Sequence, residues 1–335
     1  MRSLVVRLDS FGDVLLAGPA VRAVAARSRG VTMLCGPRGE PAARLLPGVD
    51  DVIVWAAPWE GVDPPPVAEA DVEGLVRRLR GRAYDAALIL TSFHQSPLPT
   101  ALVLRLAGVG RIGADSVDAP GSLLDVRHRR LPGRHEAQAA LDTATAMGFR
   151  PPPGDDGRLR VLPPPDTVAL TGDGPYVVVH PGASAPARAW SPGRCAEAVS
   201  LLADAGHRVV VTGGPGERDL TRRVSGATGV DLGGRTPPRT LAGVLRAADA
   251  VVCGNTGPAH LAAAVGTPVV SLFAPVVPAE RWAPYGVPYV LLGDQNAPCA
   301  DSRARRCPVP GHPCLEEVTG HDVVLAVRKL IEETA

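Results

Sequence analysis

Residues 249–273 constrain the fold of this chain more than any other stretch. They read DAVVCGNTGPAHLAAAVGTPVVSLF, in which an apolar strand (Ala250–Cys253) runs into a glycine-containing turn, a small-residue helix (Ala259–Val265) and a second apolar strand (Pro268–Phe273). Strand, helix and strand in this order indicate a parallel βαβ unit. A helix that begins directly after such a turn presents free backbone N–H groups and the positive end of its dipole, which suits a phosphate. An ordinary βαβ turn with a capped helix is the alternative.

Short apolar strands alternate with helices along both halves of the chain. In the first half the pattern predicts strands Leu4–Leu8, Val31–Cys35, Asp51–Trp55 and Ala86–Leu90, with helices Val14–Ser28, Pro41–Leu46, Ala68–Arg80, Pro99–Leu106 and His135–Met147. In the second half, besides the segment above, it predicts strands Tyr176–His180, His207–Thr212 and Val230–Leu232, with helices Pro192–Ala205, Glu217–Ser225, Leu241–Ala247 and Asp322–Glu333. This alternation favours an α/β fold with parallel, doubly wound, Rossmann-like sheets.

A proline-rich segment separates the two halves. Arg150–Thr167 contains six prolines and shows no apolar periodicity, which is typical of a linker. With 335 residues the chain is long enough for two domains, expected at 1–160 and 168–335, with the C-terminal helix as a candidate to pack back on the first domain. Two doubly wound halves predict a cleft between the carboxyl ends of their sheets, where ligands of such folds bind.

Charge and composition limit the class of partner. A formal net charge of +1 gives no broad basic surface for nucleic acid. Almost all basic residues are arginines, with Lys329 as the only lysine, so the presence of an arginine at one position says little about its function. Met1–Ser3 leads directly into the first strand, which leaves no room for a signal peptide, and no run reaches the roughly 18 apolar residues of a membrane span. We therefore expect a cytoplasmic protein with its six cysteines mostly reduced and any membrane contact peripheral.

Asp13 is the first residue with a candidate chemical role. It follows the first predicted strand, at the start of a helix and at the mouth of the expected cleft. One reading is that Asp13 caps this helix, which is a common use of aspartate. The other is a general base that faces the second domain. Gly12 stands alone where a dinucleotide-binding protein has G-x-G-x-x-G, which disfavours a nicotinamide oxidoreductase.

Two loops of the second half offer groups for a nucleotide. In HPGASAPARAW, Ser184 supplies a hydroxyl and Arg188 a guanidinium for a phosphate, although a lone surface arginine is the plain alternative. Glu217 follows a glycine-rich turn, where it can accept hydrogen bonds from ribose hydroxyls or simply favour the start of a helix.

Four potential metal ligands gather near the C-terminus: Cys299, Cys307, His312 and Cys314. Their spacing lacks the C-x-x-C pair of a zinc knuckle, so we expect packed, reduced thiols and no metal, with metal binding as the open alternative.

Taken together, these segments resemble glycosyltransferase family 9, the bacterial heptosyltransferases of lipopolysaccharide core synthesis, essentially from end to end. Gly12-Asp13 resembles the family's strand–GD–helix motif, and HPGAS followed by R-x-W resembles its phosphate loop. GNTGPAHLAAAVGTPVVSLF resembles its strongest signature, and Arg281–Pro284 and the cysteine-containing tail also fit. The resemblance implies a GT-B fold, no cofactor, and inverting, metal-independent transfer from a nucleotide sugar, usually ADP-heptose, to a glycan or glycolipid acceptor.

The resemblance also implies roles for individual residues. Asp13 would deprotonate the acceptor hydroxyl. The first domain would bind the acceptor and the second the nucleotide sugar. Of the remaining positions, the diphosphate contacts would be Ser184, Arg188, Thr256, Gly257 and His260, the ribose contact Glu217, and the donor-sugar contact Asn255.

Two departures from the family pattern affect the donor. Arg188 stands where the family usually has lysine, which keeps the charge and changes its geometry. Asn255 stands where an aspartate usually touches the donor sugar, and its neutral amide can also donate hydrogen bonds. A nucleotide-sugar epimerase of the same fold and a non-catalytic nucleotide-sugar binding protein are the alternative functions.

The acceptor side carries fewer signals. His135 matches the start of a family helix on that side. Arg127–Arg130 forms a small basic run with two readings, a solvated surface turn or a contact with a phosphorylated glycolipid at the inner face of the membrane.

Overall fold

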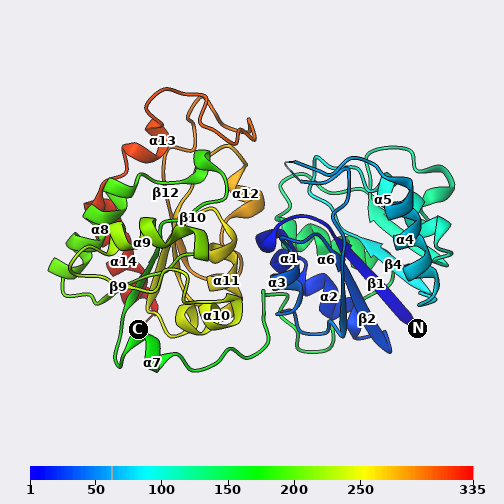
Figure 1. The fold of residues 1–335 in the computed structure, drawn as a ribbon, viewed down its shortest axis with the longest axis horizontal. Coiled ribbons are helices and arrows are strands. Elements are labelled where there is room, and N and C mark those ends of the chain that lie inside the picture. The colour runs from blue at the N-terminus through cyan, green and yellow to red at the C-terminus, as the bar shows by residue number, and fades with distance from the viewer. Residues whose placement is uncertain (62, 335) are drawn as a thin grey trace. The chain divides into compact units, whose positions relative to one another are not determined.

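The structure, a computed structural model, describes residues 1–61 and 63–334. The chain divides into two compact units, Met1–Leu162 and Pro163–Ala335. Each unit has one six-stranded parallel sheet with helices on both faces (Figure 1). The predicted α/β class with two doubly wound parallel sheets is confirmed.

The first sheet has the strand order β3-β2-β1-β4-β5-β6. Its strands are β1 (Arg2–Arg7), β2 (Gly30–Cys35), β3 (Asp51–Val54), β4 (Ala86–Ile89), β5 (Arg111–Asp115) and β6 (Val126–His128). Its longer helices are α1 (Phe11–Leu16), α2 (Gly18–Ala25), α4 (Glu69–Arg80), α5 (Leu98–Leu106) and α6 (Glu136–Ala146), with the short α3 (Glu40–Ala43) after β2. Because β1 lies between β2 and β4, the strand order reverses beside it.

The second sheet repeats this plan with the order β12-β11-β10-β7-β8-β9. Its strands are β7 (Val177–His180), β8 (Val209–Val211), β9 (Val230–Asp231), β10 (Ala250–Gly254), β11 (Val269–Leu272) and β12 (Tyr289–Leu292). The helices are α7 (Val168–Thr171), α8 (Pro192–Asp204), α9 (Arg218–Ser225), α10 (Pro238–Arg246), α11 (Gly257–Val265), α12 (Ala279–Trp282), α13 (Pro313–Glu316) and α14 (Gly320–Thr334). Here the order reverses between β7 and β10.

Burial explains why most residues of the central strands are apolar. Each is covered on both faces, as in Val177–His180 and Ala250–Gly254, where every residue is buried. In the first unit one core lies between the sheet and helices α4 and α5, and α2 packs against α6. In the second unit α8 and α14 cover one face of the sheet, while α10 and α11 pack together.

Three strands were absent from the sequence prediction: β5, β6 and β12. Their residues are RIGAD, VRH and YVLL, and β6 and β12 lie at sheet edges. A search for apolar runs finds strands buried on both faces, and it misses short edge strands that expose part of their surface.

The predicted helix Val14–Ser28 is two helices, α1 and α2, that meet at Ala17. Pro19 lies in the first turn of α2, where a missing backbone N–H is tolerated, whereas it would interrupt a continuous helix. Helix α1 therefore starts three residues earlier than expected, and Asp13 lies inside its first turn.

The proline-rich segment is held by both units rather than hanging free. Arg22 of α2 makes a bidentate pair with Asp155, at 2.6 Å from Nε and 2.8 Å from Nη2. This hydrogen bonding lowers the pKa of the Asp155 carboxyl to about 2. Further along, the carbonyl oxygen of Pro165 packs against α10 so closely that Gly243 has no room for a Cβ, which would lie 2.4 Å from that oxygen.

Helix α14 belongs to the second unit in its packing. It contacts α8 and strands β10, β11 and β12, and its residues Val323, Val327 and Leu330 are fully buried in that unit's core. No helix within residues 1–61 and 63–334 is long and apolar enough to cross a membrane.

Two helix glycines of the second unit test this packing as a pair. Gly243→Ala forces a methyl group onto the Pro165 carbonyl and is expected to destabilise the unit by about 1–3 kcal/mol. Gly193→Ala in α8, where no atom lies within 4 Å of the new methyl group, is expected to stabilise it by about 0.5 kcal/mol. Urea unfolding measures both, and equal effects of the two substitutions would contradict the packing described for α10.

Candidate active site

Each sheet presents a point at which its strand order reverses, between β1 and β4 in the first unit and between β7 and β10 in the second. Ligands of doubly wound folds bind outside the carboxyl ends of the strands at such points. The residues singled out in the sequence follow these strands. Asp13 comes after β1, Ser184 and Arg188 after β7, Glu217 after β8, and the others after β10.

Asp13 is held by contacts on both of its carboxylate oxygens. The Ser10 hydroxyl donates to Oδ2 at 2.7 Å, and the Ser10 backbone N–H lies 3.4 Å from the same oxygen. Nη2 of Arg7 lies 3.3 Å from Oδ1. The side chain is 19% exposed. Asp13 thus takes part in capping α1, as the first sequence reading expects, and its carboxylate stays partly accessible, while its role as a general base stays a prediction.

Arg7, the last residue of β1, organises this end of the first sheet. Its side chain is 3% exposed, and Nε lies 2.6 Å from Asp9. Nη2 donates to the Ser92 hydroxyl at 2.8 Å and lies 3.8 Å from Glu136. Burial by itself would lower the pKa of the Arg7 guanidinium, but Asp9, Asp13 and Glu136 together raise it. This buried cation therefore ties three carboxylates from two parts of the chain to one point.

Sequence reasoning missed Arg7, Asp9 and Glu136. A signal was present, since Arg7 follows the apolar run Leu4–Val6 at the end of β1, Asp9 lies in the next loop and Asp13 in the first turn of α1. A charged residue that ends a buried strand at the ligand-binding edge of a sheet deserves the same scrutiny as the motif beside it. Glu136 carried no comparable signal, because it looks like an ordinary first-turn glutamate of α6.

Two members of the basic run Arg127–Arg130 have partners inside the first unit, so the contact of this run with a phosphorylated glycolipid stays a prediction. Arg130 pairs with Glu136 and lies 3.2 Å from Asp115, and its side chain is 10% exposed. Arg127 donates to the carbonyl oxygens of Ser116 and Val117 at 3.0 and 2.6 Å. Both guanidinium groups are engaged inside the first unit, Arg130 by the Asp115 and Glu136 carboxylates and Arg127 by backbone carbonyl oxygens.

A second acidic group adjoins Asp9. The Gln95 amide donates to Asp9 and, at 2.8 Å, to Glu60, so that one side chain bridges two carboxyl groups. Burial, with the charge of Asp9 as the next cause, raises the pKa of the Glu60 carboxyl to about 8. Burial also raises the pKa of Asp9, against the opposing effect of Arg7. The carboxyl groups at this end of the sheet therefore outnumber the guanidinium groups that could neutralise them.

In the second unit, the loops after β7 and β10 lie against each other. A Cβ on Gly254 would lie 2.7 Å from the Arg188 carbonyl oxygen, so glycine lets the two loops approach. Helix α11 begins immediately after, with Thr256 as its N-cap and Gly257 and Pro258 as its first residues. The structure thus brings the backbone of the Arg188 loop against the turn that leads into α11. Ser184 is exposed on the same loop as Arg188.

Asn255 and His260 lie deeper, each 5% exposed. The Asn255 amide donates to the carbonyl oxygen of Ala274 at 3.4 Å, and its Oδ1 atom has no hydrogen-bond donor among the described residues. The Asn255 side chain therefore links the turn before α11 to the segment after β11. Its contact with a donor sugar stays a prediction, as do the diphosphate contacts.

Glu217 is fixed above the end of β7. Its carboxylate accepts from the Gly214 N–H at 2.7 Å and fills the space that a Cβ on Gly182 would take. The neighbouring His180 lies 4.0 Å from it, and burial lowers the pKa of that imidazole. Glu217 caps its own turn and remains 32% exposed, so its ribose contact also stays a prediction.

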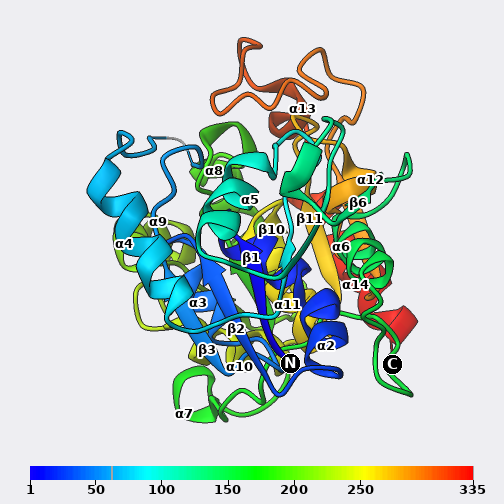
Figure 2. The ribbon, with the colours of Figure 1, turned by 90° about the vertical axis from the view of Figure 1, so that its right-hand side faces the viewer.

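The C-terminal cysteines pack in the core of the second unit. Cys299 and Cys314 are 2% exposed, and burial raises the pKa of the Cys314 thiol to about 12. Within residues 1–61 and 63–334, no three His, Cys, Asp or Glu side chains are arranged to hold a metal ion. The long loop before α13 (orange in Figure 2) instead braces the loop after β7, because Arg305 and His312 hydrogen-bond the backbone of Ala187 at 2.9 and 3.1 Å.

The chain was compared with known proteins. The sequence profile described as glycosyltransferase family 9 (heptosyltransferase) matches residues 72–312. Lipopolysaccharide heptosyltransferase 3 of Escherichia coli is 29% identical over 169 residues, which cover 47% of this chain and 47% of that protein, so the chain spans about half of that relative. Lipopolysaccharide heptosyltransferase 1 of Escherichia coli O18:K1:H7 (strain RS218 / NMEC) is 25% identical over 363 aligned positions, which cover 100% of this chain and 98% of that protein.

A solved structure shows the same architecture. The E. coli ADP-heptose lipopolysaccharide heptosyltransferase II superposes with a TM-score of 0.75 at 20% identity, over 100% of both chains. At this identity the likeness establishes the fold, which is GT-B as expected from the sequence.

The raised pKa of Glu60 predicts a pH dependence of stability. The folded chain keeps a proton on Glu60 up to about pH 8, whereas the unfolded chain releases it near the ordinary value for glutamate, so the stability of the first unit should fall as the pH rises between these values. Glu60→Gln cannot ionise, so it should match the wild type near pH 5 and be more stable near pH 8, by about 1–2 kcal/mol after allowance for solvent screening.

Urea unfolding at both pH values measures this effect. Glu69→Gln removes an exposed carboxylate from the first turn of α4 and serves as the control. The stability of this variant should depend on pH as the stability of the wild type does. A Glu60→Gln variant whose stability falls with pH as steeply as the wild type would contradict the assignment.

Proposed function

Because this chain belongs to glycosyltransferase family 9, we propose that it transfers a heptose from ADP-heptose to a hydroxyl group of a glycan or glycolipid acceptor in lipopolysaccharide or other cell-envelope synthesis. The observation that carries the proposal is the β10–turn–α11 segment at the strand-order reversal of the second sheet, packed against the Arg188 loop. The name of the matched E. coli heptosyltransferase II supports ADP-heptose as the donor. A cytoplasmic location, with peripheral contact at the inner face of the membrane, is part of the same proposal.

The second unit is proposed to bind the donor. The Gly257 backbone N–H, the α11 dipole, the Ser184 hydroxyl and the Arg188 guanidinium suit a diphosphate, with His260 beneath it. The Thr256 N–H donates to the Gly254 carbonyl oxygen at 2.8 Å, so it would have to exchange that bond for one to the diphosphate. Glu217 would accept hydrogen bonds from the ribose hydroxyls. Asn255 has a buried oxygen without a donor, and a sugar hydroxyl would satisfy it.

The first unit is proposed to bind the acceptor, with Asp13 as the general base. Its carboxylate is held by Ser10 and Arg7 and stays partly exposed, as a group that must receive a proton from a substrate requires. His135, which caps α6, is buried at 8% exposure, so its contribution would be to place that helix rather than to touch the acceptor.

The proposed reaction is a single in-line displacement with inversion at the anomeric carbon. The acceptor oxygen attacks as Asp13 takes its proton, the bond to the diphosphate breaks, and the transition state resembles an oxocarbenium ion. Negative charge grows on the departing ADP. The N-terminus of α11 and the Arg188 guanidinium would stabilise that charge, which supports a reaction without a divalent cation.

Asp13→Asn tests the function and the base together. The amide keeps the shape of the carboxylate but accepts no proton, so transfer should fall by about 10²–10⁴-fold while ADP affinity stays unchanged. Transfer is measured by mass spectrometry with ADP-heptose and a deacylated lipopolysaccharide core acceptor, and ADP affinity by calorimetry. Glu69→Gln, another helix-start carboxylate, is the control and should retain full transfer.

Three outcomes would count against this assignment. Near-normal transfer by Asp13→Asn would exclude it as the base. Release of free sugar, or formation of an altered nucleotide sugar, without an acceptor would indicate an epimerase instead. ADP-heptose binding with no turnover by the wild type would indicate a binding protein.

A metal chelator tests the proposed phosphate cradle. Because backbone N–H groups and Arg188 would supply the charge that a divalent cation supplies elsewhere, transfer should continue unchanged in excess EDTA. The measurement is the initial rate with and without EDTA, after dialysis of both substrates against a chelating resin. A loss of rate that added magnesium restores would contradict the cradle as the sole stabiliser of the leaving group.

A further inference from the structure

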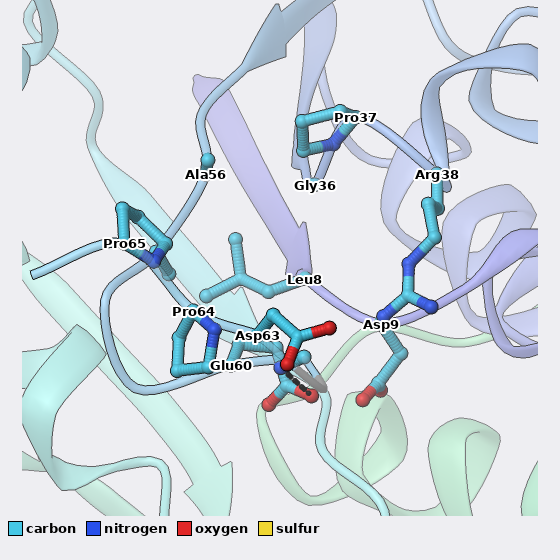
Figure 3. Close-up of a pocket in the computed structure, with 12 residues that line it drawn as sticks. Leu8, Asp9, Gly36, Pro37, Arg38, Ala56, Glu60, Asp63, Pro64 and Pro65 are labelled. Carbon is cyan, nitrogen blue, oxygen red and sulfur yellow. Dashed lines mark hydrogen bonds between the residues drawn. The ribbon is translucent and has the colours of Figure 1, made fainter.

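The first unit contains a cavity of about 300 Å³ at the carboxyl ends of β1, β2 and β3 (Figure 3). It lies beside Asp13 but is separate from it, since Asp13 does not line it. Its size is at the lower end of the range for small-molecule sites, which suits one small ring rather than an extended chain.

One part of the wall is apolar. Leu8 and Ala56 line it together with Pro37, Pro64 and Pro65, and Figure 3 shows the proline rings and the Leu8 side chain around the opening. Flat, rigid apolar groups of this kind pack against the carbon-bound hydrogens of a ring, and the prolines lose little conformational entropy on binding because they are already constrained.

The other part of the wall is acidic. Asp9, Glu60 and Asp63 line the cavity, with Arg38 as the cation among its lining residues (Figure 3). Gln95 holds Asp9 and Glu60 side by side by donating to both. The Asp9 side chain is only 9% exposed, so an acidic group forms part of the closed end of the cavity as well as its rim.

Two arginines near the cavity are already committed, and Arg38, which lines it, shares the lining with the three carboxyl groups of Asp9, Glu60 and Asp63. Arg7 serves Asp9, Asp13 and Glu136 at once, and Arg130 serves Glu136 and Asp115. The carboxyl groups of this end of the sheet therefore outnumber the guanidinium groups. The raised pKa of Glu60 has the same physical origin, namely burial next to another carboxylate.

The cavity is coupled to the proposed base through a shared guanidinium. Nε of Arg7 lies 2.6 Å from Asp9, which lines the cavity, and Nη2 lies 3.3 Å from Asp13. A sugar ring bound in the cavity would therefore be linked to Asp13 through the Arg7 side chain. Asp13 would then deprotonate the neighbouring unit of the acceptor.

We propose that this cavity binds a sugar unit of the acceptor that carries no phosphate or carboxylate group, and that its hydroxyl or amino groups donate hydrogen bonds to Asp9, Glu60 and Asp63. The inference rests on the proposed function, since it takes the first unit to bind the acceptor. It adds that the acidic wall selects against anionic sugars at this position.

Two physical terms act in the same direction. A carboxyl oxygen accepts strong hydrogen bonds from a hydroxyl or ammonium group, and each carboxylate has acceptor positions left beyond those used by Arg7 and Gln95. An anionic sugar would instead bring like charge next to Asp9 and Asp63 and would have to give up its hydration to do so.

Binding of matched monosaccharides to the full-length wild-type chain tests the proposal. The probes are methyl glucoside, methyl glucosaminide, methyl glucuronide and methyl glucoside 6-phosphate, compared by saturation-transfer NMR at neutral pH. The neutral and amino sugars should bind at least about tenfold more tightly than the two anionic sugars. Equal or tighter binding of either anionic sugar, or no binding of any probe, would overturn the proposal.

Two variants place the binding in this cavity. Ala56→Trp fills its opening and should abolish glucoside binding, whereas Ala70→Trp, at an exposed alanine of α4 outside the cavity, should leave it unchanged. Asp63→Asn removes one exposed charge and should reduce the discrimination against the glucuronide. Glucoside binding that survives Ala56→Trp, or discrimination that Asp63→Asn leaves intact, would contradict the assignment.

ADP binding by calorimetry separates this proposal from the proposed function. A chain that selects neutral glucosides but does not bind ADP would refute the donor and keep the cavity. A chain that binds ADP and transfers heptose, yet shows no such selection, would refute the cavity alone.

Discussion

The arrangement of the first unit depends on one buried cation, the guanidinium of Arg7. A charge at 3% exposure is costly to desolvate and is tolerated only because three carboxylates and a serine hydroxyl surround it. Those partners come from the loop after β1, the segment after β4 and the start of α6, so they meet only when the sheet and its covering helix are both formed. Removing the cation would leave buried carboxylates without counter-charge, a loss of about 3–5 kcal/mol in comparable pairs. The position of Asp13 is therefore a property of the whole unit.

The same network explains why this end of the sheet remains acidic. Arg7 and Arg130 are shared among several carboxylates, and Glu60 is left to hold a proton rather than a counter-ion. A fold under selection for stability alone would place an apolar side chain at such a position. An acid kept there at a cost in stability is more simply explained by a substrate that donates hydrogen bonds to it, and this ties the proposed acceptor cavity to the proposed base.

The sequence predicted the strands that are buried on both faces. It did not predict short edge strands or contacts between residues far apart in the chain. Val177–His180 and Ala250–Gly254 are apolar at nearly every position because both faces are covered, so their pattern alone revealed them. The edge strands β6 and β12 are short and half exposed, and nothing in VRH separates a strand from a loop. In the site, Asp13 and the α11 turn were found because motif and local geometry coincide. Arg7, Asp9 and Glu136 escaped because their importance lies in meeting one another across more than 120 residues of sequence.

The two sheets share one strand order, yet the loops at their reversal points carry opposite chemistry. After β1 the chain places carboxylates, which can accept a proton but would repel a diphosphate. After β10 it places glycine, threonine and a helix N-terminus, which suit an anion but hold no base. On the proposed function, transfer uses both environments, and each unit carries one of them. Next to Asp13 the charge of Arg7 is shared with Asp9 and Glu136, which limits how far Arg7 lowers the basicity of the proposed base.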